Sequence, residues 1–131
     1  MAALPWTTVH PPDPDREYVA LASFLPLRRF ASTIRFFRSV RAIRGQLANA
    51  RGLVGYSLLA RPLARSYWTV SMWEDDGALK EFVQAEPHAR VMRDLRRHLG
   101  TTKFTQIRVR GSAAPPPWDW ALDLLESTEP S

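Results

Sequence analysis

Apolar residues follow two different periods along the central part of the chain, and each period predicts a different kind of element. Segments 18–27, 53–60, 66–73 and 103–109 are short apolar or alternating runs, which is typical of β-strands. Between them, apolar residues recur at intervals of three and four, which predicts amphipathic helices. The resulting order is strand, helix, strand, strand, helix, strand.

The two helical regions have recognisable starts. Ser32 is the expected N-cap of the first helix, and Asp75 or Asp76 the N-cap of the second. Pro87 suits a first helical position, so it is expected to start a new, kinked segment of the second helix. The side chains expected to face the core are Ile34, Phe37, Val40, Ile43 and Leu47 in the first helix, and Leu79, Phe82, Val83, Val91, Met92, Leu95 and Leu99 in the second helix and its continuation.

The ends of the chain differ from this central part. Residues 1–17 are rich in proline and are expected to form an arm without regular structure, so the folded domain is expected at 18–110. Residues 111–131 comprise the linker GSAAPPP and a Trp-rich tail, with a short amphipathic helix expected at 118–125. The apolar side of this helix needs a surface to pack against.

The order of elements is that of the ferredoxin-like βαββαβ fold, an α+β architecture with both helices on one face of a four-stranded antiparallel sheet. The strands, however, are apolar on both faces. In the third strand, alternation separates two sets, Trp68, Val70 and Met72 on one face and Tyr67, Thr69, Ser71 and Trp73 on the other. In the first two strands, the expected opposing sets are Tyr18 and Phe24 against Val19 and Leu21, and Val54 and Tyr56 against Leu53 and Leu59.

An apolar sheet face left in water would be costly. Several hundred Å² at ~25 cal/mol per Å² corresponds to a loss on the order of 10 kcal/mol. We therefore expect a second copy of the chain to cover this face, giving a homodimer.

Composition narrows the function classes. The chain of 131 residues has no cysteine, which excludes disulfides and thiolate metal sites and favours a reducing, cytoplasmic compartment. No membrane span or signal peptide is expected. The net charge is +5, but the sixteen arginines are spread along the chain, which favours solvated helix faces over a nucleic-acid patch and leaves a polyanion site as the alternative.

His88 is the main candidate for chemistry, because it precedes the inward residues Val91 and Met92 by three and four positions near a helix N-terminus, where the neutral ring is favoured. The alternative is a structural histidine beside the Pro87 kink. Arg44 falls on the inward side of the first helix, where it either extends its guanidinium to solvent or directs a fixed cation inward.

Aromatic and hydroxyl side chains of the strands suggest a pocket for a flat ligand, although such aromatics often form a dimer core instead. The expected ligand-contacting residues are Tyr56, Trp68, Thr69, Ser71, Trp73 and Phe82, with Tyr67 or Arg44 as the group that stabilises a substrate anion and His88 as the base. No pattern of metal ligands or phosphate-binding loop is present, so neither a metal nor a cofactor is expected.

The segment YWTVSMWEDDGALKEFVQAEPHARVM (67–92), preceded by GLVGYSLLARPL, resembles the antibiotic-biosynthesis-monooxygenase-like group of the dimeric α+β barrel superfamily. The resemblance covers most of 18–110. It implies a homodimer whose sheets pack face to face, with a pocket between sheet and helices in each subunit. Activities in the group include cofactor-independent oxygenation of aromatic polyketides and haem degradation.

The resemblance does not favour haem degradation. The haem-degrading branch uses an Asn on the first strand and a Trp and a His on the second helix. The corresponding helix positions hold Phe82 and Val91, and the first strand, YVALASFL, has no Asn. An alignment shifted by a few residues would return His88 as a haem ligand.

The function expected from the sequence is a cofactor-independent monooxygenase that acts on an aromatic or polyketide-like substrate. The alternative is a dimeric barrel that binds an apolar ligand or braces a partner protein without turnover. RNA binding is less favoured, because RSYWTVSMW lacks the glycine and the closely alternating aromatics of the RNA-recognition motif.

Overall fold

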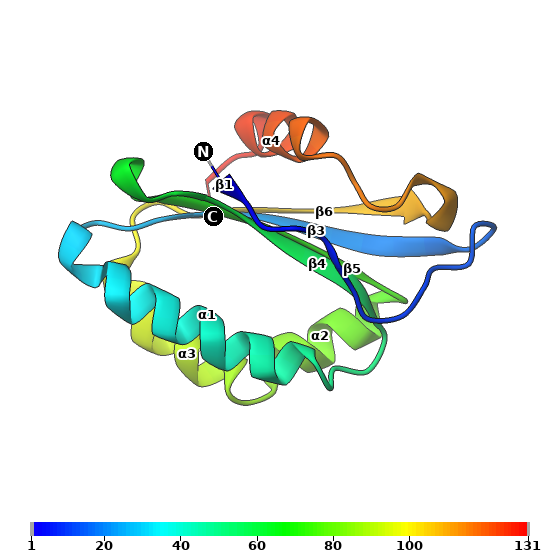
Figure 1. The fold of residues 1–131 in the computed structure, drawn as a ribbon, viewed down its shortest axis with the longest axis horizontal. Helices are drawn as coiled ribbons and strands as arrows, with labels where there is room; N and C mark the ends of the chain where they lie inside the picture. Colours follow the sequence, from blue (N-terminus) through cyan, green and yellow to red (C-terminus); the bar gives the residue numbers. More distant parts are fainter. Residues whose placement is uncertain (1, 131) are drawn as a thin grey trace.

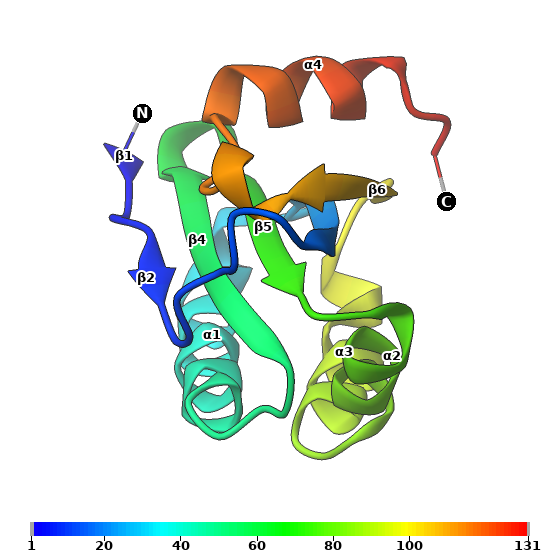
Figure 2. The same cartoon turned by 90° about the vertical axis from the view of Figure 1, so that its right-hand side faces the viewer.

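The computed structural model describes residues 2–130, and it has the expected α+β architecture. Its central elements are β3 (Glu17–Pro26), α1 (Thr33–Leu47), β4 (Leu53–Arg61), β5 (Ser66–Trp73), α2 (Asp76–Gln84), α3 (His88–Leu95) and β6 (Lys103–Arg110). The four strands form an antiparallel sheet in the order β4, β5, β3, β6. Helices α1, α2 and α3 cover one face of this sheet (Figures 1 and 2). The βαββαβ order predicted from the sequence is therefore confirmed.

Short helical turns connect several of these elements. They are η1 (Phe30–Ser32), η2 (Pro62–Ala64), η3 (Arg96–His98) and η4 (Gly111–Ala113). No helix within residues 2–130 is long and apolar enough to cross a membrane.

The N-terminal segment extends the sheet along its outer edge. Strands β1 (Ala2–Ala3) and β2 (Thr7–Thr8) both pair antiparallel with β4. The Ser57 hydroxyl donates to the carbonyl of Leu4 at 2.7 Å, and the Trp6 ring lies directly on Gly55, where an added Cβ would be 2.6 Å from the indole. The expectation of no regular structure here is wrong, because the free edge of β4 offers hydrogen-bonding partners to the arm.

The core under the helices differs from the expected stripe of α1. Phe36 is 2% exposed and stacks on Tyr67 with ring centroids 4.2 Å apart, whereas Ile34 is 69% and Phe37 42% exposed. Intervals of three and four fit both registers, so the rotation of the helix is set by its contact with β5. In α2, Val83 is also exposed rather than inward.

The predicted N-caps have different outcomes. Asp75 caps α2, since its carboxylate accepts a hydrogen bond from the Ala78 amide at 2.7 Å. Ser32 precedes α1, but its hydroxyl does not cap the helix; it shares a 3.1 Å hydrogen bond with Nδ1 of His98. His98 is therefore half-buried against η1.

A β-bulge in β4 changes which side chains share a face. Leu53 pairs with Trp73, but Gly55 rather than Val54 is the next partner, opposite Met72. The extra residue shifts the alternation, so Tyr56 packs with Leu53 on the helix side. The expectation that Tyr56 shares the face of Val54 is wrong for this reason.

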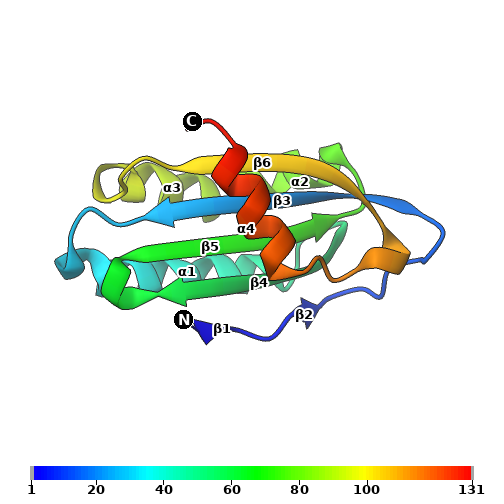
Figure 3. The ribbon, with the colours of Figure 1, turned by 90° about the horizontal axis from the view of Figure 1, so that it is seen from above.

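The other face of the sheet is covered by the chain's own C-terminal helix, α4 (Trp118–Ser127), which crosses β3 and β6 (Figure 3). Ala121 and Leu125 of α4 form a buried cluster with Ala22 and Val70 of the sheet. Five aromatic residues surround this cluster: Trp6, Phe24, Trp68, Trp118 and Trp120. We expected a second subunit to cover this face; in the structure, α4 does so because its apolar side needs the same surface.

Candidate functional site

The helix-facing side of β5 is the starting point of the candidate site. Tyr67 and Trp73, at 0% and 1% exposure, are buried at the two ends of the strand, while Thr69 and Ser71 between them are only half-buried. The strand lies in the interior of the sheet, so solvent reaches the layer between sheet and helices at these two hydroxyls. Ser71 is oriented by Trp73, whose Nε1 donates to its Oγ at 2.8 Å.

Three aromatic rings connect this strand to the helical layer. Trp73 lies 5.1 Å from Phe82 of α2, and Phe82 lies 4.9 Å from His88 at the start of α3, measured between ring centroids. Such tilted contacts at 4.5–7 Å are favourable between aromatic rings. The expected residues Ser71, Trp73, Phe82 and His88 are therefore brought together as one connected group.

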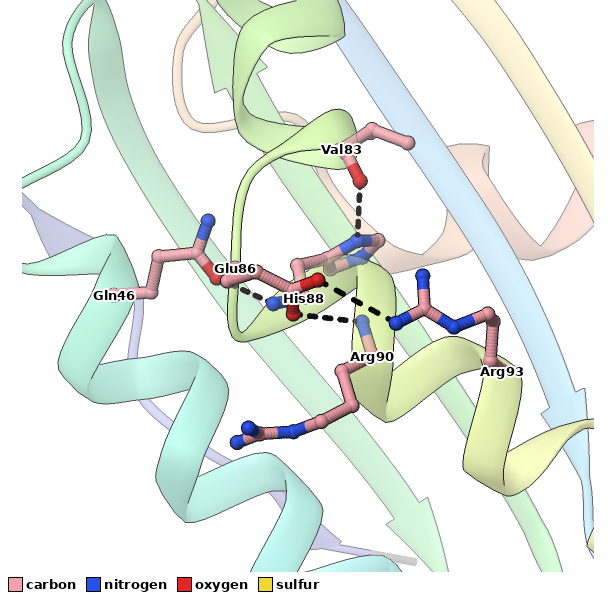
Figure 4. A network of polar contacts seen from close by, with 6 residues as sticks. All are labelled: Gln46, Val83, Glu86, His88, Arg90 and Arg93. Carbon is pink, nitrogen blue, oxygen red and sulfur yellow. Dashed lines mark hydrogen bonds and ion pairs between the residues drawn. The ribbon is translucent and has the colours of Figure 1, made fainter.

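The imidazole of His88 is held in one orientation. Its Nδ1 lies 3.2 Å from the carbonyl oxygen of Val83, which can only accept, so a neutral ring carries its proton on Nδ1 (Figure 4). The lone pair then resides on Nε2. Burial lowers the pKa of His88, and the hydrogen bond to Val83 opposes this only in part. The ring is therefore neutral at pH 7 and capable of accepting a proton at Nε2.

Gln46 of α1 fixes the corner between α2 and α3. Its Oε1 accepts from the His88 amide at 2.8 Å (Figure 4). Its Nε2 donates to the Phe82 carbonyl at 3.1 Å. Both ends of one amide thus hold the two residues that carry the ring contact. Sequence reasoning missed Gln46, because a polar residue on a helix is ordinarily solvated and nothing in the pattern distinguishes this one.

The nearby carboxylate of Glu86 is engaged elsewhere. It accepts from the Arg90 amide at 3.1 Å and lies 3.5 Å from the Arg93 guanidinium (Figure 4). Among the hydrogen bonds and ion pairs of residues 2–130, Glu86 has none to the His88 ring, so the partner of that ring is the backbone carbonyl.

A cleft of about 550 Å³ opens between α1 and the α2–α3 corner. Gln46, Phe82 and Pro87 line it together with Arg51 and Glu81, whose side chains form an exposed ion pair at 2.7 Å. His88 is not among the lining residues, although its ring contacts that of Phe82. Phe82 is therefore the link between the cleft and the histidine.

Two expected catalytic residues lie apart from this group. Tyr67 packs in a second core cluster with Phe36, and burial raises the pKa of its hydroxyl, an effect that Thr33 partly offsets. That hydroxyl has no hydrogen-bond partner of ordinary geometry within residues 2–130. Arg44 is exposed on α1 and does not line the cleft, so Arg51 is the lining arginine instead.

One expected ligand-contacting residue also separates from the group. Trp68 lies on the opposite face of the sheet, where it contacts Phe24 with ring centroids 5.3 Å apart. Tyr56, by contrast, is half-buried against the cluster that contains Trp73 and Phe82, and it is paired with Ser71 across the sheet. Within the described part of the chain, no group of three or more His, Asp or Glu residues is placed to hold a metal ion.

Solved structures show the same fold. The cofactor-independent oxygenase SnoaB from Streptomyces nogalater is 18% identical, with a TM-score of 0.60 over 76% of this chain and 98% of that one. A candidate antibiotic biosynthesis monooxygenase from Caulobacter crescentus is 14% identical, with a TM-score of 0.63 over 70% of this chain and 89% of that one. This chain has the antibiotic-biosynthesis-monooxygenase-like ferredoxin fold.

Other proteins with this fold are longer. A candidate monooxygenase from Lactobacillus acidophilus is 9% identical, with a TM-score of 0.65 over 79% of this chain; the chain spans only 49% of that protein. No protein-family model and no curated protein matches the sequence. At these identities the monooxygenase-like fold is shared, while the chemistry has to be argued from the site itself.

Proposed function

We propose that the chain is a cofactor-independent oxygenase that acts on an electron-rich aromatic substrate. The observation that carries this proposal is a neutral, oriented His88 in tilted contact with Phe82, which lines the cleft. Structures that share the fold include a cofactor-independent oxygenase, which supports the same class of chemistry.

The proposed reaction begins with proton abstraction. Nε2 of His88 takes a proton from a phenol or enol, and the resulting anion reduces O2. One oxygen atom forms a new C–O bond on the ring and the other leaves as water, so that a phenol becomes a quinone. Phe82, which lines the cleft, packs against the substrate with Trp73 buried behind it, and the protein needs no metal or flavin.

The anion requires a positive or hydrogen-bonding partner. Arg51 is proposed for this role in place of Arg44, because it lines the cleft and its ion pair with Glu81 is exposed. An exposed ion pair contributes little free energy, so Arg51 loses little when it exchanges Glu81 for a bound phenolate.

Oxygen consumption tests the proposal. We expect the purified chain to consume O2 with naphthol- or anthrone-type phenols without added metal or flavin, and His88→Asn to slow this about a hundredfold, since a general base contributes 10²–10⁴. Asparagine keeps a donor for the Val83 carbonyl. The control His10→Asn, in the exposed arm, should leave the rate unchanged. Equal rates for both variants would disprove the role of His88 as the base.

A second candidate is a module that binds an apolar ligand without turnover. The position of His88 outside the cleft lining favours it. Titration of the phenols by tryptophan fluorescence separates the two candidates: saturable binding that Phe82→Ala weakens, with no O2 consumed, indicates the binding module. Neither candidate needs the homodimer expected from the sequence, because α4 covers the sheet face assigned to the second copy. Light scattering of the full chain tests whether a dimer forms through another surface.

A further inference from the structure

A second concave site lies at the opposite end of α3 from His88, next to η3. It is a pocket of about 360 Å³, here called the basic pocket. Its lining consists of Arg28, Arg29, Ala31, Ser32, Arg35, Arg97 and His98. Four guanidinium groups therefore surround one cavity, and the lining contains no carboxylate.

These charges are not neutralised within the chain. The ion pairs among residues 2–130 involve Arg51, Arg93 and Arg108, and none of the arginines of the basic pocket. The first turn of α1 holds no acidic residue, and Arg35 lies there, where a cation opposes the positive end of the helix dipole. An arrangement that places like charges together without a counter-charge is stabilised by an anion from outside.

The walls of the basic pocket are held together before any ligand binds. The Arg28 amide donates to the His98 carbonyl at 2.9 Å, and Nε of Arg28 donates to the Leu99 carbonyl at 2.7 Å. The hydrogen bond between Ser32 and His98 joins η1 to η3. Arg28 uses one of its five donors in this way, so its guanidinium is positioned and its remaining donors are available.

The pKa of His98 reflects the positive charges around it. Burial and then the charges of Arg35, Arg97 and Arg29 lower its pKa, so the ring is neutral at pH 7 and can share in hydrogen bonding rather than add a fifth charge. The guanidinium groups of Arg29, Arg35 and Arg97 thus all lower the pKa of the same imidazole, that of His98.

We propose that the basic pocket binds a phosphate or similar tetrahedral oxyanion carried by a small molecule. Planar guanidinium groups match such oxyanions with paired hydrogen bonds. The volume is that of a small-molecule site. A nucleic-acid strand would need further cations along its path, whereas Phe30 and Ile34, next to the lining residues in the chain, are exposed and apolar.

Calorimetric titration of the full-length chain with inorganic phosphate and with pyrophosphate, at constant ionic strength in KCl, tests the proposal. We expect saturable binding, tighter for pyrophosphate, and weakened about tenfold or more in the double variant Arg35→Gln/Arg97→Gln, because hydrogen bonds to charged groups are lost. Arg41→Gln is the control: it removes one of the charges of the same helix outside the pocket, and binding should change less than twofold.

Thermal melting gives an independent readout. Phosphate should raise the melting temperature of the wild-type chain relative to chloride at equal ionic strength, and should not raise that of the double variant. The proposal is overturned if neither anion binds at 10 mM, if Arg41→Gln weakens binding as much as the double variant, or if only single-stranded oligonucleotides bind.

Discussion

His88 shows how one side chain acquires a defined chemical state from its surroundings. The Val83 carbonyl determines which ring nitrogen carries the proton, Phe82 covers one side of the ring, and Gln46 holds the backbone amide of the same residue. None of these contacts is itself a catalytic group. Together they produce a neutral imidazole whose Nε2 is the acceptor, which is the property that the proposed proton abstraction requires.

The lowered pKa of His88 also predicts how stability depends on pH. The unfolded chain binds a proton at His88 below about pH 6.5, while the folded chain resists protonation until a lower pH. The stability contribution is therefore complete above pH 6.5 and is lost as the pH falls through the folded pKa. We expect the melting temperature to fall between pH 7.5 and 5.5, and to fall less in His88→Asn.

His98 has a lowered pKa as well, so the wild-type curve alone does not isolate His88. The difference in melting temperature between wild type and His88→Asn across the same pH range isolates His88, because both proteins contain His98. If the two curves run parallel, His88 does not titrate differently in the folded and unfolded chains.

At the scale of elements, α4 packs through one stripe. Leu125, 2% exposed, lies in the cluster with Ala22 and Val70, while Leu124 on the neighbouring position is half-buried. Leu125→Ala is expected to lower the free energy of unfolding by about 2–4 kcal/mol through lost burial and a cavity. Leu63→Ala, at a position that is 90% exposed, is the control and should change it by less than about 0.5 kcal/mol.

Denaturant unfolding followed by circular dichroism measures both variants. Equal stability of Leu125→Ala and wild type would show that α4 does not pack on the sheet in solution.

At the scale of the whole molecule, the sheet is covered on both faces by one chain, by α1, α2 and α3 below and by α4 above, while the N-terminal arm pairs along the edge of β4 (Figures 1 and 3). Deleting residues 112–131 uncovers the surface around Ala22, Val70 and Trp68. We expect the truncated protein to associate. The ratio of its light-scattering mass to the mass of one chain should exceed the same ratio for the full-length protein at equal micromolar concentration. An unchanged ratio would show that α4 is not what shields this face.

The sequence by itself determined the order and type of the central elements, because strand and helix periods and the Asp75 cap are local properties. His88, Trp73 and Phe82, which the sequence assigned to one site, are linked by ring contacts in the structure. Their role as a site stays a prediction. The prediction failed where a local pattern fits two arrangements. The spacing in α1 allows either Phe36 or Phe37 to face the core, and the structure buries Phe36. The bulge in β4 moves Tyr56 to the opposite face from the one expected.

Only the tertiary structure decided which distant segments meet. Gln46 reaches His88 across 42 positions, Arg28 joins Leu99 across 71, and α4 returns to the sheet that we had assigned to a second subunit. Such contacts depend on the rotation of each helix and on strand register, which are set by packing against partners far away in the chain. The cleft, the basic pocket and the covered sheet face all arise at this level.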